Sequence, residues 1–304
     1  MRALDVFFRT VSALGEYHPA TRRRKANTRL IDEDVAYRPG NDPAYLLDIH
    51  APKDAQGSLP VVIYIHGGGF RILSKNTHRS LARRFAEAGY LVVNINYRLT
   101  PAGRFPNALD DVCAALLWTL EHIEDYGGDL SRLVYAGESA GGNLALALAM
   151  VGCFEVDEPW AKAVFEAQPN PQAVLPACGM LEVHNAERYL NDESIPRWMR
   201  SRIKLVCEGY RADSPSGCLA SPLQLLESDQ ETARPLPPIF SICGGNDPIL
   251  GDTERLGRAL ERRGNAGGVT IYPGSIHAFQ AFFGANAKQA WRDQFEFLDE
   301  HLKP

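Results

Sequence analysis

From about residue 60 onward, short apolar runs rich in β-branched residues alternate with segments of helical periodicity, and this alternation strongly constrains the fold. Helical patterns over residues 78–89 and 107–123 carry apolar residues at i, i+3 or i+4, and i+7. Strands that are apolar at nearly every position are buried on both faces. The sequence therefore predicts an α/β protein of three layers, with a mostly parallel central sheet and helices on both faces. The predicted strands are residues 59–66, 90–97, 132–138, 171–178, 237–244 and 268–274.

Three segments lie outside this alternation. Residues 34–39 and 44–52 are expected to form a leading antiparallel pair. Residues 184–213 are helical in tendency, and 11 of these 30 residues are charged. Residues 1–30 carry a helical apolar stripe, formed by Leu4, Phe7, Val11 and Leu14.

Ligands of open α/β sheets bind beyond the carboxyl ends of the strands, so we expect the two helical segments to form a cap over such a site. The predicted organisation has four parts. They are N-terminal cap helices and lead-in (1–44), a first part of the core (45–183), an inserted cap segment (184–215) and a second part of the core (216–304).

Composition narrows the choice of partners and compartment. The net charge of −5 gives no reason to expect nucleic-acid binding, and no apolar run approaches the ~18 residues of a membrane span. Asp5 and Arg9 interrupt the N-terminal apolar stretch, so no secretory signal is predicted. The six cysteines show no metal-ligand spacing. We expect a cytoplasmic protein with reduced thiols and no membrane contact. A homodimeric assembly is left open.

Residues 137–142 read GESAGG and crowd small residues around one hydroxyl, that of Ser139. The predicted strand 132–138 precedes this serine and a helical pattern follows it, which is the context of a G-x-S-x-G nucleophile elbow. We expect Gly137 and Gly141 to remove side chains that would collide across the bend. The helix N-terminus behind the serine favours developing negative charge.

A nucleophilic serine needs a base and an acid that orients it. In strand–turn–helix hydrolases the chain order is serine, acid, histidine. His277 follows the last predicted strand and Asp247 follows the strand before it, so both fall on the correct loops. His184 precedes most of the acids, and His301 lies in the C-terminal helical segment. The predicted catalytic residues are therefore Ser139, Asp247 and His277.

The run IHGGGF at residues 65–70 ends the predicted strand before the first helix. Consecutive glycines leave backbone N–H groups able to approach a carbonyl oxygen. We predict an oxyanion hole from the N–H groups of Gly68, Gly69 and Ala140. A phosphate-binding loop is the alternative for such glycines, but its lysine is missing.

Together the motifs YLLDIHAP, IHGGGF, NYRLTP, FPNALDD, GESAGGNLAL, DPIL and YPGSIHAF resemble the hormone-sensitive lipase-like branch of the α/β-hydrolases, which includes many bacterial carboxylesterases. The resemblance covers about residues 45–300. It implies the α/β-hydrolase fold with a helical cap, and the same triad and oxyanion residues. Four positions depart from the family pattern: Glu138 replaces the usual aspartate, Ala102 replaces a glutamate, Gly251 replaces a second acid, and Ala278 replaces a glycine.

The predicted function is a serine hydrolase that cleaves carboxylic esters of short to medium acyl chain through an acyl-enzyme intermediate. The expected partner is a small-molecule ester, and no metal or organic cofactor is implied. Two alternatives stay open. One is an amidase or formamidase with the same triad, and the other is a non-catalytic small-molecule receptor, although such receptors typically lack the histidine. Expected substrate contacts are Phe70, Glu138, Trp198 and Phe279, with Met199 and Ile203 as further apolar candidates on the cap.

Overall fold

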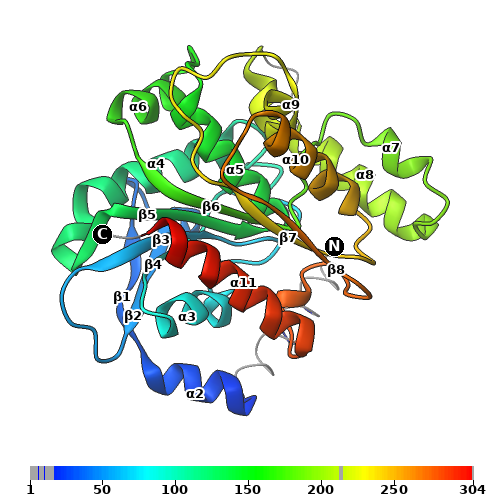
Figure 1. Ribbon diagram of the computed structural model, residues 1–304. Coiled ribbons are helices and arrows are strands. Elements are labelled where there is room, and N and C mark those ends of the chain that lie inside the picture. Colours follow the sequence, from blue (N-terminus) through cyan, green and yellow to red (C-terminus); the bar gives the residue numbers. More distant parts are fainter. Residues whose placement is uncertain (1–5, 7–9, 11–16, 212–214, 303–304) are drawn as a thin grey trace.

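A sheet runs through the middle of the molecule in the computed structural model, which describes residues 6, 10, 17–211 and 215–302 (Figure 1). Six strands lie in the order β1-β2-β4-β3-β5-β6, and β2 runs antiparallel to both of its neighbours. The other neighbouring pairs of this sheet are parallel. The strands are β1 (Thr28–Ala36), β2 (Leu46–Pro52), β3 (Leu59–Ile65), β4 (Leu91–Ile95), β5 (Gly128–Glu138) and β6 (Pro171–Ala177).

Two further strands, β7 (Phe240–Gly244) and β8 (Gly268–Tyr272), form a parallel pair beside β6. A single parallel bridge between Val174 and Ile239 joins this pair to the larger sheet. The N–H of Cys178 also donates to the carbonyl of Ile242 at 2.7 Å. The predicted strands and the mostly parallel sheet are thus confirmed, together with the leading antiparallel pair.

Helices cover both faces of the sheet because successive strand side chains point to opposite sides. Val62 and its neighbours pack against α3 (Arg79–Glu87) and α11 (Ala285–His301), which lie below the sheet in Figure 1. Ile63 and its neighbours pack on the other side against α4 (Asn107–His122), α5 (Ala140–Cys153) and α6 (Pro159–Ala167). All fourteen residues of α5 are buried, which makes it the central helix of the larger core.

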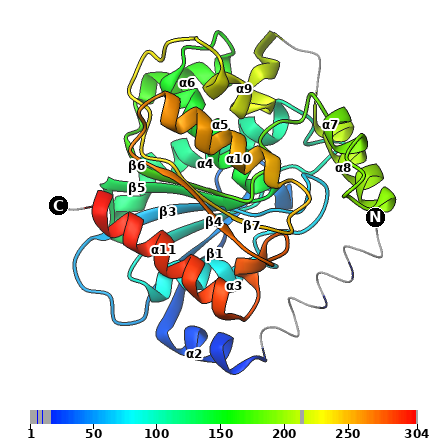
Figure 2. The ribbon, with the colours of Figure 1, turned by 45° about the vertical axis from the view of Figure 1, so that its right-hand side comes forward.

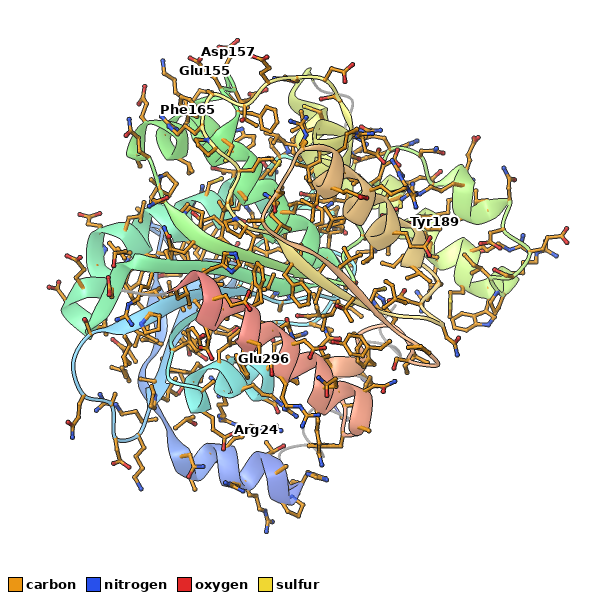
Figure 3. All side chains as sticks on the ribbon, in the orientation of Figure 1. Arg24, Glu155, Asp157, Phe165, Tyr189 and Glu296 are labelled. Atoms are coloured by element: carbon orange, nitrogen blue, oxygen red, sulfur yellow. The ribbon has the colours of Figure 1, made fainter. Side chains whose placement is uncertain are left out.

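The inserted segment contains α7 (Glu187–Leu190) and α8 (Arg197–Tyr210), which project at one side of the molecule (Figure 2). Tyr189 of α7 is labelled there in Figure 3. The chain then returns through a 3-10 turn (Pro215–Ala220) and α9 (Pro222–Glu227) to β7 and α10 (Leu250–Arg262). The division of the chain into core and cap stays a prediction.

At the N-terminal side, α2 (Pro19–Asn27) lies beside α3 and β1. The apolar stripe of Leu4, Phe7, Val11 and Leu14 falls outside the described residues. Three short 3-10 helices complete the described chain: Pro43–Tyr45, Ile123–Tyr126 and Phe279–Ala281. In the described ranges, no helix combines the length and apolar character needed to cross a bilayer.

Candidate active site

Ser139 occupies a sharp bend between the end of β5 and the start of α5. Its backbone has φ 57° and ψ −117°, a conformation that is costly for a residue with a side chain. The bend is held because the N–H of Ser139 donates to the carbonyl of Ala177 at 3.0 Å. A Cβ at Gly137 would meet the Gly141 carbonyl, and one at Gly141 would overlap the carbonyl oxygen of Ile65. The expected steric role of these two glycines is therefore confirmed.

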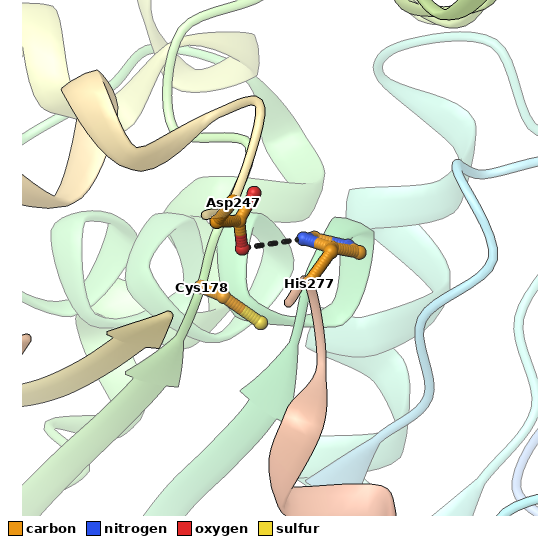
Figure 4. Close-up of side chains that lie close together, drawn as sticks. All are labelled: Cys178, Asp247 and His277. Atoms are coloured by element: carbon orange, nitrogen blue, oxygen red, sulfur yellow. Dashed lines mark hydrogen bonds and ion pairs between the residues drawn. The ribbon is translucent and has the colours of Figure 1, made fainter. Parts of the chain in front are cut away.

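The structure brings Ser139, His277 and Asp247 together from three different loops at the carboxyl ends of the strands. The Nε2 atom of His277 lies 3.0 Å from the Oγ atom of Ser139. Its Nδ1 atom lies 2.7 Å from the Oδ2 atom of Asp247 (Figure 4). Because a carboxylate can only accept, Nδ1 carries the proton and Nε2 is left to accept from the serine hydroxyl.

The environment of His277 favours its charged form. Its side chain is 34% exposed, whereas that of Asp247 is fully buried. Burial opposes charge on the imidazole, but the Asp247 carboxylate outweighs this effect and raises the pKa of His277 above its ordinary value. The carboxylate of Asp247 is itself fixed, because its Oδ1 atom accepts the N–H of Ile249 at 2.9 Å. The arrangement can take a proton from Ser139 and stabilise the resulting imidazolium.

The three predicted oxyanion donors lie in the loop after β3 and at the first residue of α5. Gly68 and Gly69 have φ values of +114° and +59°. Residues with a side chain rarely adopt such positive φ values, whereas glycine does so at little cost. Within the described chain, no acceptor is found for the N–H groups of Gly68, Gly69 or Ala140. Free N–H groups beside a serine nucleophile can donate to the oxygen of a tetrahedral intermediate.

The carboxylate of Glu138 holds the glycine loop after β3 in place. Its Oε1 atom accepts the N–H of Gly67 at 2.6 Å and lies 2.7 Å from Nε2 of His78, while its Oε2 atom accepts from the hydroxyl of Tyr64. Burial disfavours both charges of the Glu138–His78 pair, but their attraction raises the pKa of His78 and lowers that of Glu138. Burial also lowers the pKa of neighbouring His66 to about 3, so this histidine stays neutral.

This network corrects one expectation from the sequence. With its oxygens committed to three protein donors, Glu138 holds the loop in position and does not line a substrate pocket. Sequence reasoning missed His78 and Tyr64 altogether, because neither belongs to a motif and both reach Glu138 only through the tertiary fold.

The remaining predicted substrate contacts fall in different places. Phe70 is fully buried, and its ring stacks on that of Tyr210 of α8, with centroids 3.7 Å apart. Trp198 is 66% exposed on α8, so its contact with substrate stays a prediction. Phe279 is buried in a small apolar cluster and packs on Tyr272. These contacts give Phe279 a place in the core rather than the predicted place against substrate.

Cys178 lies beside the acid and the base, with its Sγ atom and one ligand atom of each of them all within 4.8 Å of one another (Figure 4). Such a group has the residue types of a metal site. In the absence of a cation, burial raises the pKa of the Cys178 thiol far above its ordinary value, so the thiol is neutral at neutral pH. The hydrogen bond between Asp247 and His277 also occupies two of the three candidate ligand atoms. The geometry fits proton transfer better than metal binding.

Fold and site together define an α/β-hydrolase with a serine, an acid and a histidine at the carboxyl edge of its sheet. A family model described as alpha/beta hydrolase fold matches residues 62–281. Because this match covers more than half of the chain, the protein belongs to that family, the hormone-sensitive lipase-like α/β-hydrolases.

Individual relatives agree with this assignment. The chain is 30% identical to esterase LipI of Mycobacterium tuberculosis over 234 residues, which are 75% of this chain and 68% of LipI. A solved structure named bacterial heroin esterase is 25% identical, with a TM-score of 0.75 over 91% of this chain and 86% of that one. The esterase of Pyrobaculum calidifontis has a TM-score of 0.77 at 23% identity over 99% and 94% of the two chains, and it supports the fold alone.

Proposed function

We propose that the protein is a serine carboxylesterase that hydrolyses small esters of short to medium acyl chain. The observation that carries the proposal is the hydrogen-bonded chain Ser139–His277–Asp247. The names of the relatives, esterase and carboxylesterase, support the same reaction class.

In the proposed mechanism, the Oγ atom of Ser139 attacks the ester carbonyl while Nε2 of His277 takes the hydroxyl proton. Asp247 stabilises the imidazolium, and the N–H groups of Gly68, Gly69 and Ala140 receive the negative oxygen. Collapse of this intermediate breaks the ester C–O bond, and His277 returns its proton to the leaving alcohol. Water then attacks the acyl-serine by the same route, which releases the acid and restores Ser139.

The preference for short acyl chains rests on the inserted segment. A lipase at an oil–water interface needs a large apolar surface, whereas α8 exposes charged side chains such as Lys204 and Glu208. Of its apolar residues, Ile203 and Cys207 are buried, whereas Trp198 and Leu205 are exposed among these charges. On the inner side, Val206 lies close to Gly69, so α8 packs directly over the oxyanion loop. We therefore expect activity to peak at acyl chains of roughly two to eight carbons, limited by a closed pocket.

The two alternatives differ from this proposal in separate ways. An amidase or formamidase would use the same residues, and only the leaving group would distinguish it. A non-catalytic receptor would need neither the base nor its acid. The pairing of His277 with both neighbours therefore favours an enzyme over a receptor.

The test is a panel of p-nitrophenyl esters from acetate to palmitate, with a formanilide for comparison. We expect the shorter esters to be preferred and kcat of Ser139→Ala to fall by at least about 10⁴-fold. A fluorophosphonate probe should label wild-type protein at Ser139, as located by mass spectrometry. Turnover retained in Ser139→Ala would contradict the mechanism. Preference for emulsified long-chain esters would contradict the chain-length assignment, and preference for the formanilide would favour the amidase.

A further inference from the structure

Arg71 lies in the turn that follows the predicted oxyanion glycines. This turn is closed because the N–H groups of Arg71 and Ile72 both donate to the carbonyl of Gly68 at 3.2 Å. Within the described chain, the Arg71 guanidinium makes no hydrogen bond and no ion pair. Other partly buried arginines, such as Arg38 and Arg98, each pair with two carboxylates. The positive charge of Arg71 is therefore left without a counter-charge beside the proposed catalytic residues.

The charged end of Arg71 is accessible to a ligand, although the base of its guanidinium is enclosed. The residue is half-buried, and Nε is the one nitrogen of its guanidinium that is both inaccessible and without a partner. The two Nη atoms therefore keep accessible surface and free N–H donors. The donors of a guanidinium match the two oxygens of a carboxylate, so this end of Arg71 suits an anionic oxygen group.

The cap helix α8 passes over this guanidinium. A Cβ at Gly209 would overlap the Nη1 atom of Arg71, so the helix approaches closely at a position without a side chain. Three residues earlier, Val206 packs on Gly69, and its Cγ2 atom lies 2.9 Å from where a Cβ of that glycine would be. Positions three residues apart lie on one face of a helix, about 5–6 Å from each other. The guanidinium is thus about one helical turn from the proposed oxyanion donor at Gly69.

Neighbouring contacts hold the backbone that carries Arg71. Phe70 has a φ of +56°, which is costly for a residue with a side chain. The stacking of its ring on Tyr210 of α8 stabilises this conformation, and its carbonyl accepts the N–H of Thr100 at 2.7 Å. Because the backbone is already fixed on the N-terminal side of Arg71, less conformational entropy is lost when a ligand orders the side chain.

The charge of α8 favours the same kind of ligand. Four of its 14 residues are basic and one is acidic: Arg197, Arg200, Arg202, Lys204 and Glu208. The whole chain carries a net charge of −5, so the cap helix is opposite in sign to the molecule. Local positive charge raises the concentration of anions near a site. The unpaired arginine and the basic helix above it together suit a substrate that carries a negative group.

We propose that Arg71 forms a subsite for the carboxylate of an ester that carries a second, anionic group, such as the monoester of a dicarboxylic acid. The carboxylate is bound by the Nη atoms beneath α8 while the ester carbonyl lies at Ser139. Arg71 binds and orients the substrate and takes no part in proton transfer. The inference rests on the proposed esterase function and adds a substrate class to it.

The test compares anionic esters with neutral esters of matching size. Monomethyl adipate and methyl hexanoate differ in charge on the acyl side, and 4-acetoxybenzoate and 4-acetoxybenzamide differ on the alcohol side. We expect Arg71→Gln to lower kcat/KM at least about tenfold for one of the two anionic esters, mainly through KM. Both neutral esters should stay within about twofold of wild type. The contrast between wild type and Arg71→Gln should shrink as salt is added.

Gly209→Ala provides a second variant, because its methyl group must displace the Nη1 atom of Arg71. It should lower kcat/KM for the same anionic ester and spare the neutral ones, and it keeps the test valid if Arg71→Gln does not fold. Lys204→Gln removes a half-exposed charge on the same helix and should keep the selectivity of wild type.

The inference is overturned if Arg71→Gln lowers kcat/KM equally for anionic and neutral esters, or if neither anionic ester is affected. It is also overturned if Lys204→Gln has the same effect as Arg71→Gln. Failure of the wild-type protein to hydrolyse the neutral esters would instead contradict the proposed esterase function.

Discussion

At the scale of single residues, the protonation of His277 depends on burial, which lowers its pKa, and on the carboxylates of Asp247 and, to a smaller extent, Glu138, which raise it. The imidazole must be neutral to accept the proton of Ser139, and Asp247 raises its pKa above the ordinary 6.5. The rate therefore falls as pH drops through this raised value, and the acid limb of kcat/KM should lie above pH 6.5. In Asp247→Asn, burial still lowers the pKa of His277, but the Asp247 carboxylate that raises it is gone. The acid limb of kcat/KM should therefore move to lower pH, and kcat should fall by about 10⁴-fold.

The measurement is kcat/KM for p-nitrophenyl butyrate from about pH 5 to pH 9 in both proteins. Asp293→Asn serves as the matched control, because Asp293 of α11 accepts from the hydroxyl of Tyr272 and is not among the groups that shift the pKa of His277, so the limb should stay in place. A wild-type limb at or below pH 6.5 would show that Asp247 does not control the base.

Glu138 is the second residue on which the geometry depends, because it accepts the N–H of Gly67. Glu138→Gln keeps an acceptor for this N–H, whereas Glu138→Met has a similar length and no acceptor. We expect Glu138→Met to lower kcat by about 10- to 100-fold with little change in KM, since displaced oxyanion donors act mainly on the transition state. Glu138→Gln should retain more activity, and Glu138→Asp should still hydrolyse esters.

Equal kcat values in the Gln and Met variants would mean that the hydrogen bond to Gly67 has no catalytic consequence. Thermal unfolding provides a separate readout. The raised pKa of His78 contributes stability that is present below the ordinary histidine pKa and is lost as pH rises through the raised value. The stability difference between wild type and Glu138→Gln should therefore shrink as pH rises through that window.

At the scale of elements, an ion pair between Arg188 of α7 and Asp252 of α10 links the inserted segment to the core. Arg188 of α7 contacts the carboxylate of Asp252 at 2.6 Å, and Asp252 also accepts the N–H groups of Leu181 and Glu182. Asp252 is fully buried, so Arg188→Met leaves its carboxylate with only the more distant guanidinium of Arg255, at 3.9 Å, as a cationic partner. We expect a loss of about 3 kcal/mol of unfolding free energy, together with a raised KM because α8 is less well held over Gly69.

The matched control is Lys204→Met on α8. Lys204 and Glu208 lie 3.7 Å apart and are both about half exposed, with exposed fractions of 50% and 46%. Such a pair contributes under about 1 kcal/mol, so urea unfolding should separate the two variants clearly. Similar losses in both would show that Arg188 is no anchor. The double variant Arg188→Met, Asp252→Asn should recover part of the lost stability.

At the scale of the whole molecule, the sheet and the meeting of distant residues could be predicted from local patterns. Ser139 and His277 are 138 residues apart, yet the sequence places both correctly because parallel strands deliver their following loops to one edge. The start of β1 was harder to predict from the sequence. It begins at Thr28 rather than near Asp34, because most side chains of this edge strand are exposed and its polar sequence carries little periodic signal.

Side-chain partnerships across the fold could not be predicted. The pairing of His78 with Glu138 depends on how α3 and β5 are placed, and neither residue signals it in its own neighbourhood. The position of Arg71 beneath Gly209 likewise arises only when α8 folds back over the loop after β3. Both features result from packing between segments that are distant in sequence, and periodicity carries no information about such packing.

The junction between β6 and β7 separates the proposed catalytic residues into two stretches of chain. Ser139 and the glycine loop belong to the six-stranded part, while Asp247 and His277 follow β7 and β8. During synthesis the nucleophile is therefore made well over a hundred residues before its base. In the proposed mechanism, a nascent chain would carry its serine elbow without the base His277, and hydrolysis would begin only when the last strands dock. The onset of hydrolysis would then report that both parts have come together.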